Sequence, residues 1–335
     1  MIPISDENNS ANLKTDSRAA KLGISVVIPV FNSEATLSEL IETLGRVLGQ
    51  VADQYELVLV NDGSRDGSWN EINRLSSAYT WIHGINLMRN YGQHNALLCG
   101  IRAARNEVVV VMDDDLEHPP DEIRKLLRKL DEGYDVVYGV PQESQHGLLR
   151  NAAAKVTKMA LKGALGAETA SKVSPYRAFR TKLRDAFANY QSSFVSIDVL
   201  LTWGTNRFAA VPVRYDPRRS GKSQYTIHKL ITHALNMMTG FSVIPLQLAS
   251  LLGFSVTLFG LLLLGFVLRQ YFTRGHEVPG FTFLASIIII FSGAQLFALG
   301  IFGEYLARIH FRMMERPSYV IMSTTQKSGP EHRLL

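Results

Sequence analysis

Short apolar runs alternate with helical patterns in the first two thirds of the chain. "ISVVIPV", "YELVLV", "EVVVVM" and "DVVYGV" predict strands over residues 24–30, 55–60, 107–112 and 135–140. Between them, residues 34–48 and 121–133 carry apolar side chains three and four positions apart, which predicts amphipathic helices. Strands that are apolar throughout and separated by helices favour an α/β domain with a mostly parallel sheet, covered on both faces.

The last third of the chain has a different pattern. Residues 245–268 and 281–303 are apolar and carry no charged side chain. A helix of about 20 apolar residues crosses a bilayer core, so each segment is long enough to span it; a buried core helix is the alternative, and it fits these lengths poorly. Basic residues precede the first apolar segment and follow the second. The positive-inside rule therefore places the large domain and both chain ends in the cytoplasm.

These patterns divide the chain into five parts. They are a flexible N-terminal tail (1–23), an α/β domain (24–224), an amphipathic juxtamembrane helix (225–243), a membrane domain with two helices (244–310) and a cytoplasmic tail (311–335). The juxtamembrane helix either lies in the headgroup layer or packs on the domain, and the sequence leaves both options open. The N-terminal tail has no apolar centre and does not resemble a signal peptide.

Composition narrows the class of partner. The net charge is +5, and no dense block of Lys and Arg marks a nucleic-acid binder, so we expect no nucleic-acid partner. A modest basic excess fits a membrane surface or a phosphate-bearing substrate. Cys99 is the only cysteine, which excludes an internal disulfide and a zinc site built from cysteines.

Three adjacent carboxylates, Asp113 to Asp115, follow the strand at 107–112. Ligands of parallel sheets bind at this end of the strands. Side chains alternate along an extended segment, so Asp113 and Asp115 point one way and Asp114 the other. Two converging carboxylates suit Mg²⁺ or Mn²⁺, which bridges protein carboxylates to substrate phosphates. The alternative is that Asp115 or a neighbour caps the helix that starts near Pro119.

The segment "VNDGSRDGS" places Asp62 at the tip of the neighbouring strand. Its carboxylate can accept two hydrogen bonds from a planar imide edge, such as uracil or guanine offers. The alternative is a plain turn that uses Gly63 and Ser64. The shared crevice with Asp113 favours the base-binding interpretation.

Phosphate binding must rest on side chains and metal, because the sequence contains no GxGxxG after the first strand and no P-loop motif. Arg218, Arg219 and Lys222 lie on a glycine-containing segment and can bind phosphate; a basic loop that faces the membrane is the alternative. Arg89 and His94 lie near a predicted helix start. A lone histidine there is more often structural, so His94 at most lines the site.

Six segments in order carry a family resemblance. "VVIPVFNSEATL", "LVLVNDGSRDGS", "MRNYGQHNA", "VVVVMDDDLEHPPDEI", "SPYRAFR" and "RRSGKSQY", followed by two apolar spans, resemble the polyprenyl-phosphate glycosyltransferases of glycosyltransferase family 2. These are enzymes with the GT-A fold, a Rossmann-like fold, and are related to dolichol-phosphate mannose synthase. "RNYGQH" is most similar to the bacterial undecaprenyl-phosphate branch. The resemblance covers residues 24 to about 320.

The resemblance implies roles for individual residues. Asp62 would bind the nucleotide base, and Asp113 and Asp115 would form a DxD pair that holds the ribose and a divalent metal on the diphosphate. Further residues of the nucleotide site would be Pro29, Asn32, Glu34, Arg89, Lys222 and Ser223. Arg218 would meet the donor and acceptor phosphates, and it would act in catalysis together with Asp115.

The resemblance leaves the catalytic base open. Many relatives carry an aspartate where this chain has Ser171. Asp198, inside an apolar helical pattern, is either a replacement base or the partner of an arginine, and Glu168 is a weaker candidate. A phosphate monoester has a second pKa near 6, so a lipid phosphate acceptor is largely ionised at neutral pH and needs little proton removal.

Together these features predict an inverting glycosyltransferase anchored in the inner (plasma) membrane. It would use Mg²⁺ or Mn²⁺ to move a sugar from a UDP-sugar to undecaprenyl phosphate at the cytoplasmic face, and copies of it can associate as homo-oligomers. A processive polysaccharide synthase is one rival, but the chain has no QxxRW segment and only two predicted spans. A catalytically silent membrane scaffold protein is the other.

Overall fold

The computed structural model describes residues 22–142, 172–192, 195–216, 244–274 and 280–325. Its sheet consists of β1 (Ile24–Val30), β2 (Tyr55–Asn61), β3 (Ile82–Leu87), β4 (Val108–Val111), β5 (Val136–Pro141), β6 (Arg177–Arg180), β7 (Phe208–Val213) and β8 (Ile321–Thr324). The strand order is β7-β5-β6-β4-β1-β2-β3-β8. Strands β4, β1, β2 and β3 are parallel, whereas β6 and β8 run antiparallel to their neighbours.

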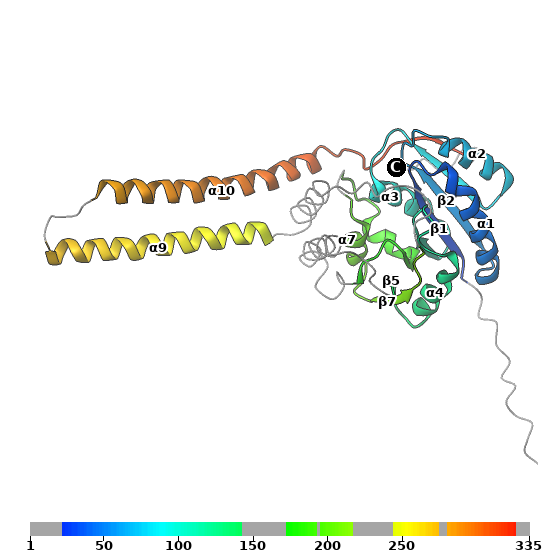
Figure 1. Cartoon of the computed structure of the whole chain (residues 1–335), viewed down its shortest axis with the longest axis horizontal. Helices are drawn as coiled ribbons and strands as arrows, with labels where there is room; N and C mark the ends of the chain where they lie inside the picture. The colour runs from blue at the N-terminus through cyan, green and yellow to red at the C-terminus, as the bar shows by residue number, and fades with distance from the viewer. Residues whose placement is uncertain (1–21, 143–171, 193–194, 217–243, 275–279, 326–335) are drawn as a thin grey trace, which may run out of the picture.

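Helices cover both faces of this sheet (Figure 1). In the sheet domain they are α1 (Glu34–Val51), α2 (Ser68–Ala78), α3 (Gln93–Ala103), the 3₁₀ helix η1 (Pro120–Glu122), α4 (Ile123–Asp131), the 3₁₀ helix η2 (Thr181–Phe187) and α7 (Ile197–Thr202). Two long helices, α9 (Ile244–Arg274) and α10 (Phe281–Met313), follow outside it. Buried residues of α1, α2 and α4 form one apolar cluster with the sheet, and those of α3, η2 and α7 form a second on the other face.

The centre of the sheet explains why its strands are apolar throughout. In β1, Val26 and Ile28 belong to the first cluster, while Val27 between them belongs to the second, and all three are fully buried. Side chains alternate between the two faces of a strand, and both faces are covered by helices here. No position of such a strand is left for a solvated polar side chain.

The four strands predicted from the sequence correspond to β1, β2, β4 and β5, with ends that agree within one residue. The sequence did not predict β3, β6, β7 or β8. Strand β8 lies within residues 311–335, which were expected to form a tail; part of that segment instead completes the edge of the sheet beside β3. Residues 1–21 and the predicted juxtamembrane helix at 225–243 lie outside the described residues.

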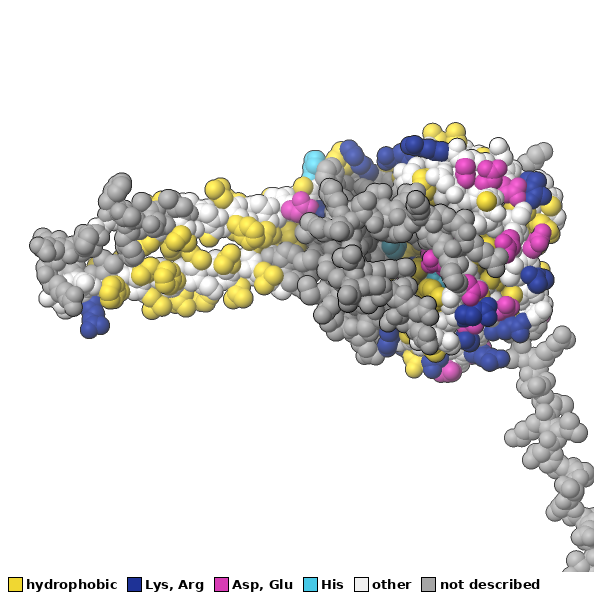
Figure 2. Space-filling model, in the orientation of Figure 1, with side chains coloured by type: hydrophobic (Ala, Val, Ile, Leu, Met, Phe, Trp, Pro, Cys, Tyr) yellow, Lys and Arg dark blue, Asp and Glu magenta, His cyan; other side chains and the backbone are white. Residues whose placement is uncertain are grey.

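Helices α9 and α10 run side by side away from the sheet domain (Figure 1). They contain two segments that are long and apolar enough to cross a membrane, Leu246–Gln270 and Ile290–His310, and neither is buried. At about 1.5 Å per residue these segments are about 38 Å and 32 Å long, against about 30 Å for a bilayer core. Figure 2 shows hydrophobic side chains exposed along both helices, as expected for helices that face lipid rather than a protein core.

The two long helices pack closely at one glycine. A Cβ atom on Gly260 of α9 would lie 2.6 Å from the ring of Phe291 on α10. Small residues let membrane helices approach each other where little hydrophobic force acts between them. Gly260 therefore provides the space into which Phe291 packs.

Candidate active site

The carboxyl ends of the parallel strands lie at one edge of the sheet. Val30 is opposite Asn61, and Asn61 is opposite Asn86, so β1, β2 and β3 end side by side. Strand β4 ends next to β1, with Val111 opposite Val27. The loops that follow these four strands therefore converge, as the sequence predicted for the ligand crevice.

Polar side chains join the loop after β1 to the loop after β2. The Asn32 carboxamide oxygen accepts from the Arg65 N–H at 2.8 Å, and the Asn32 N–H donates to the Ser64 hydroxyl at 3.0 Å. The Glu34 carboxylate accepts from the Gly67 N–H at 3.0 Å. Asn32 has a φ of 55°, which asparagine tolerates better than most residues. Asn32 and Glu34, both predicted for the nucleotide site, thus fix the relative position of these two loops.

Asp62 is buried at the tip of β2 and bound to the loop after β3. Its two carboxylate oxygens accept from the backbone N–H groups of Tyr91 at 2.7 Å and Gly92 at 2.8 Å. Burial raises the pKa of Asp62, and the two N–H donors oppose that rise. Each carboxylate oxygen can accept a second hydrogen bond, so the contact with a nucleotide base stays a prediction.

Gly63 lets the same two loops meet backbone to backbone. Its φ is 67°, and a Cβ atom there would lie 2.5 Å from the Asn90 nitrogen and 2.6 Å from the Arg89 carbonyl carbon. Real Cβ atoms do not approach backbone this closely, so no other residue fits without moving the loop. The plain-turn interpretation of this segment misses that tertiary contact.

The three aspartates after β4 turn to different partners. Asp113 accepts from the Gln93 side-chain amide at 2.7 Å, and Asp114 accepts from the Phe31 N–H at 3.2 Å. Asp114 thus binds the end of β1 while Asp113 faces the start of α3. The opposite directions of these two side chains agree with the predicted alternation.

Asp115 tightens the turn rather than capping the next helix. Its carboxylate accepts from the Glu117 N–H, two residues further on, at 3.1 Å. The 3₁₀ helix begins at Pro120, follows Pro119 and receives no side-chain cap. The alternative in which Asp115 serves as a helix cap is therefore not seen.

The carboxylate cluster fits a divalent cation. Burial, followed by the charges of Asp115 and Asp114, raises the pKa of Asp113 to about 7. Such repulsion is relieved when a cation joins the carboxylates. Across the described residues, no three His, Cys, Asp or Glu side chains form a complete metal cage. A Mg²⁺ ion is nevertheless commonly bound by only two protein carboxylates, with substrate phosphates completing its coordination.

A buried ion pair lies behind the cluster. The guanidinium of Arg177 in β6 binds the carboxylate of Asp198 in α7, and the Tyr138 hydroxyl donates to the same carboxylate at 3.0 Å. Arg177 is opposite Val111, two residues before Asp113, and its positive charge opposes the rise in the pKa of Asp113. Of the two roles left open for Asp198, the structure shows the arginine partner.

Three other predicted residues are described. Pro29 is buried within β1. The exposed Arg89 guanidinium lies 4.6 Å from the centre of the Tyr91 ring, in a cation–π contact. The Nδ1 atom of His94 accepts from the Ile197 N–H at 3.4 Å, which joins α3 to α7 and agrees with a structural role. The remaining predicted residues, Arg218, Lys222, Ser223, Ser171 and Glu168, lie outside the described residues.

The sequence missed two residues of this region. Gln93 binds Asp113, and it stands in the quoted segment "RNYGQH", but nothing in that segment shows which polar side chain faces the carboxylates. Arg177 is the first residue of strand β6, "RAFR", and is buried, and a buried cation requires an acid as its partner. Pairing Arg177 with Asp198, the acid in an apolar helix, would have found the contact.

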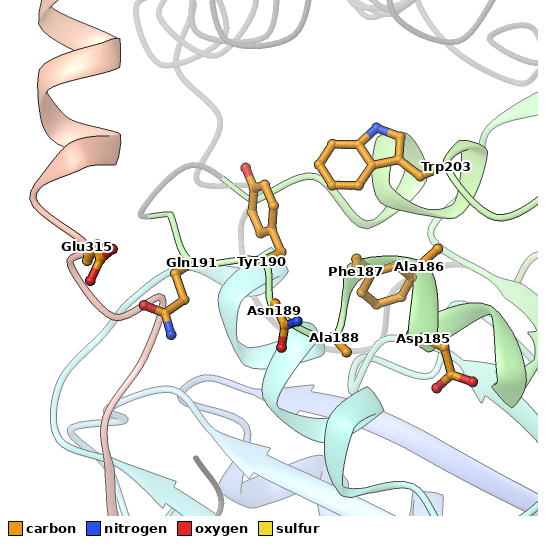
Figure 3. A pocket seen from close by; sticks show the side chains of 9 residues that line it. All are labelled: Asp185, Ala186, Phe187, Ala188, Asn189, Tyr190, Gln191, Trp203 and Glu315. Atoms are coloured by element: carbon orange, nitrogen blue, oxygen red, sulfur yellow. The ribbon is translucent and has the colours of Figure 1, made fainter.

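A cavity of about 600 Å³ lies elsewhere on the domain (Figure 3). It is lined by Asp185, Ala186, Phe187, Ala188, Asn189, Tyr190, Gln191, Trp203 and Glu315. The rings of Tyr190 and Trp203 meet edge to face, 5.5 Å between centres. None of the predicted nucleotide or metal residues lines this cavity.

Comparison with known proteins gives concordant sequence matches. Residues 25–190 match the family model described as Glycosyl transferase family 2. The chain is 35% identical over 301 residues to an undecaprenyl-phosphate 4-deoxy-4-formamido-L-arabinose transferase of Shewanella sediminis, which covers 89% of this chain and 91% of the relative. A transferase of the same description from Klebsiella pneumoniae is 33% identical over 309 residues, with 91% and 94% covered.

One solved structure also resembles the chain. It is the glucosyl-3-phosphoglycerate synthase of Mycobacterium tuberculosis in complex with Mn²⁺, UDP and glucosyl-3-phosphoglycerate. The TM-score is 0.50 at 19% identity, and the match covers 66% of this chain and 78% of that chain. At this identity the likeness shows a shared fold.

Proposed function

Because this chain belongs to glycosyltransferase family 2, and within it to the polyprenyl-phosphate glycosyltransferases, we propose that it transfers one sugar from a UDP-sugar to undecaprenyl phosphate. The transfer inverts the anomeric centre and takes place at the cytoplasmic face of the inner membrane. The curated relatives are named for 4-deoxy-4-formamido-L-arabinose, so its UDP derivative is the first donor to test.

One observation carries the proposal. The half-buried carboxylates of Asp113 and Asp115 follow the end of β4, at the edge of the sheet where Asp62 follows β2. A nucleotide diphosphate has a base for Asp62 and a charged diphosphate for the carboxylate pair and its cation. A protein of the same fold has been solved with UDP and Mn²⁺, which supports this choice of ligand.

The chain's own residues would bind and orient the donor. Asp113 and Asp115 would hold Mg²⁺ or Mn²⁺, which supplies charge that stabilises the leaving diphosphate. Asn32 and Glu34 join the loops after β1 and β2, which would border the nucleotide. A phosphate oxygen of the acceptor then bonds to the anomeric carbon as the bond to the β-phosphate oxygen breaks, and UDP leaves with the electron pair.

This reaction requires little from a catalytic base. The acceptor phosphate has a second pKa near 6 and is mostly dianionic at neutral pH, so its oxygen is already a nucleophile. Asp198 is held by Arg177 and Tyr138 inside the protein, which does not favour it as a base. Correct positioning of donor and acceptor would provide most of the acceleration.

The two apolar helices α9 and α10 support the proposal that the acceptor is a lipid embedded in the membrane. An enzyme that only meets soluble substrates needs no such anchor. With two spans the chain returns to the side from which it came, and the basic flanks favour a cytoplasmic location for the domain.

The test uses the full-length protein in detergent with undecaprenyl phosphate, Mg²⁺ or Mn²⁺, and a panel of UDP- and GDP-sugars. Nucleotide release and glycolipid formation are followed together, and the anomeric configuration of the product is determined by NMR. Metal-dependent glycolipid of inverted configuration from a UDP-sugar is the expected result. Nucleotide binding without glycolipid would point to the silent scaffold protein instead, and a growing polymer would point to a processive synthase.

A further inference from the structure

The chain returns to the catalytic domain after its second long helix. Residues Ser318–Thr325, here called the C-terminal strap, include β8 and lie along β3 at the edge of the sheet. At one end the Ser318 hydroxyl donates to the Ser192 carbonyl oxygen at 2.8 Å. At the other end the Thr325 N–H donates to the Gly84 carbonyl oxygen at 3.0 Å, and the Thr325 hydroxyl accepts from the Gly84 N–H at 2.8 Å.

The strap has one face against the protein and one toward solvent. Tyr319 and Ile321 pack against the second apolar cluster, whereas Val320 and Met322 are exposed. Alternation with a period of two is expected for a strand that covers a core on one face. The Arg102 guanidinium of α3 also lies 5.8 Å from the centre of the Tyr319 ring. The strap is therefore docked through specific side chains and not only through its backbone.

The strap contacts the segment that leads into the loop of Asp62. The Met88 N–H, directly before Arg89, donates to the Val320 carbonyl oxygen at 2.9 Å. The Asn86 side-chain amide donates to the Met322 sulfur at 3.5 Å. The same Asn86 side chain accepts from the Asn61 amide, beside Asp62, at 2.7 Å.

The loop held in this way is the partner of the predicted base-binding residue. The backbone N–H groups of Tyr91 and Gly92 donate the two hydrogen bonds that the Asp62 carboxylate accepts. The backbone at Asn90 lies so close to Gly63 that position 63 has no room for a side chain. A shift of this loop therefore removes the two hydrogen bonds that hold the Asp62 carboxylate in place. The strap fixes the start of the loop, and Asp62 fixes its end.

The connection to the membrane helix is short. Helix α10 ends at Met313, and only residues 314–317 separate it from Ser318. Five residue steps span at most about 18 Å. The end of the membrane helix and the donor side of the active site are thus joined by a strand with fixed contacts.

We propose that the C-terminal strap is a positioning element of the donor site, which holds the Arg89–Gly92 loop against Asp62 and links donor binding to the membrane hairpin. This inference rests on the proposed function, because it takes the loop around Asp62 as the nucleotide site. It assigns a role in donor binding to residues more than 220 positions away from Asp62 in the sequence. The strap need not touch the substrate to act in this way.

Ile321→Asp tests the proposal, because it places a charge against the apolar cluster and releases the strap. Val320→Asp is the matched control, since it adds the same charge to the exposed neighbour, and Ile321→Val is the conservative rescue. Cys99 reports release: it is the only cysteine, it is 2% exposed, and burial raises its pKa to about 12, so it should resist thiol reagents while the strap is docked.

The measurements are the Kd for UDP in the presence of Mn²⁺, the KM for undecaprenyl phosphate, and the rate of thiol labelling of the full-length protein. In Ile321→Asp we expect labelling of Cys99 and a rise in the Kd for UDP of about tenfold, worth about 1.4 kcal/mol, with the acceptor KM unchanged. The control and the rescue variant should behave as wild type. Leu130→Ala, a cavity variant in the other apolar cluster, should lower thermal stability without changing the Kd.

Two results would overturn the proposal. One is wild-type affinity for UDP in an Ile321→Asp protein whose Cys99 is labelled, because the strap is then released without any effect on donor binding. The other is an equal loss of affinity in Leu130→Ala, which would make the effect one of general stability. A wild-type protein that binds neither UDP nor GDP would contradict the proposed function, and with it this inference. A wild-type protein that binds UDP, together with a released variant that binds it equally well, would contradict this inference alone.

Discussion

Arg177 and Asp198 form an ion pair inside the protein, with their side chains 3% and 7% exposed. The Tyr138 hydroxyl completes the arrangement by donating to the Asp198 carboxylate. A buried charge is tolerated because its partner is present, so each member depends on the other. The pair joins β6 to α7 directly behind the strand that carries Asp113, and so supports the frame of the carboxylate cluster.

Removing one partner should therefore destabilise the protein more than removing both. Arg177→Met leaves the Asp198 charge buried and unpaired, and we expect a loss of about 3–5 kcal/mol. The double variant Arg177→Met with Asp198→Leu replaces the pair by apolar side chains and should regain most of that loss. Thermal unfolding of the purified variants in detergent measures both.

The same variants distinguish the two roles considered for Asp198. An arginine partner predicts that Asp198→Asn lowers the unfolding temperature, since Arg177 is left without its counter-charge. A catalytic base predicts a folded protein of wild-type stability whose turnover is lost. The second outcome would contradict the assignment made from the ion pair.

Gly63→Ala should abolish donor binding. The variant forces a side chain into a φ of 67° and into the backbone at Asn90, so the loop bound to Asp62 must move. Gly133→Ala is a matched control, because Gly133 also has a positive φ, 99°, but has open space around it. The control should lose about 1–2 kcal/mol from backbone strain alone and should bind UDP normally. UDP binding by Gly63→Ala with wild-type affinity would refute the close packing of these loops.

Asp113→Asn and Asp115→Asn should each abolish metal-dependent turnover while the fold stays intact. Even outer partners of metal ligands commonly contribute 10–100-fold, so we expect losses of at least about 100-fold. Asp113→Asn removes repulsion between carboxylates, and its unfolding temperature should not fall. Glycolipid formation at saturating Mn²⁺ and thermal unfolding are the measurements, with the exposed Asp131→Asn as control. Full activity in both variants would exclude the carboxylate pair as the metal site.

Part of the fold could be predicted from the sequence because the central strands are buried on both faces. Strand β1 is apolar at nearly every position, and no turn or helix pattern competes with it. Strand β3, "IHGINL", lies in the same sheet but contains His83, Gly84 and Asn86, which break its apolar pattern. Each of these residues contacts a partner that is distant in sequence, and a local pattern does not show such partners. Strand β8 follows the long apolar helix α10, and only its contacts with β3 show that it belongs to the sheet.

The site divides in the same way. The positions of Asp62 and Asp113 follow from the rule that ligands bind where parallel strands end, and the sequence is enough for that. The partners of these carboxylates do not follow, because the Tyr91 and Gly92 N–H groups and the Gln93 amide are brought in by tertiary packing. A sequence pattern shows which residues can act as acids, but not which donors meet them.

Acid should remove a contribution to stability that comes from Glu56. This buried carboxylate accepts from the Ser25 hydroxyl at 2.6 Å and the Arg105 N–H at 2.6 Å, and it lies 3.4 Å from the His83 Nε2 atom. Burial alone would raise the pKa of Glu56, but the hydrogen bonds from His83, Ser25 and Arg105 outweigh it and lower the pKa below its usual 4.5. The folded protein therefore binds this proton less readily than the unfolded chain does.

The sign of the pH dependence follows from that difference. Above pH 4.5 the Glu56 carboxylate is ionised in both states, and its full contribution to stability is present. As the pH falls below 4.5 toward the lowered pKa, the unfolded chain takes up the proton first and the contribution is lost. Glu56→Gln should lose about 1.5–3 kcal/mol at pH 7, the usual value of hydrogen bonds to a charged group, and its difference from wild type should shrink in acid. Unfolding temperatures between pH 3 and 7 measure this, with the exposed Glu42→Gln as control; a difference that is constant over this range would mean that Glu56 keeps its ordinary pKa in the folded protein.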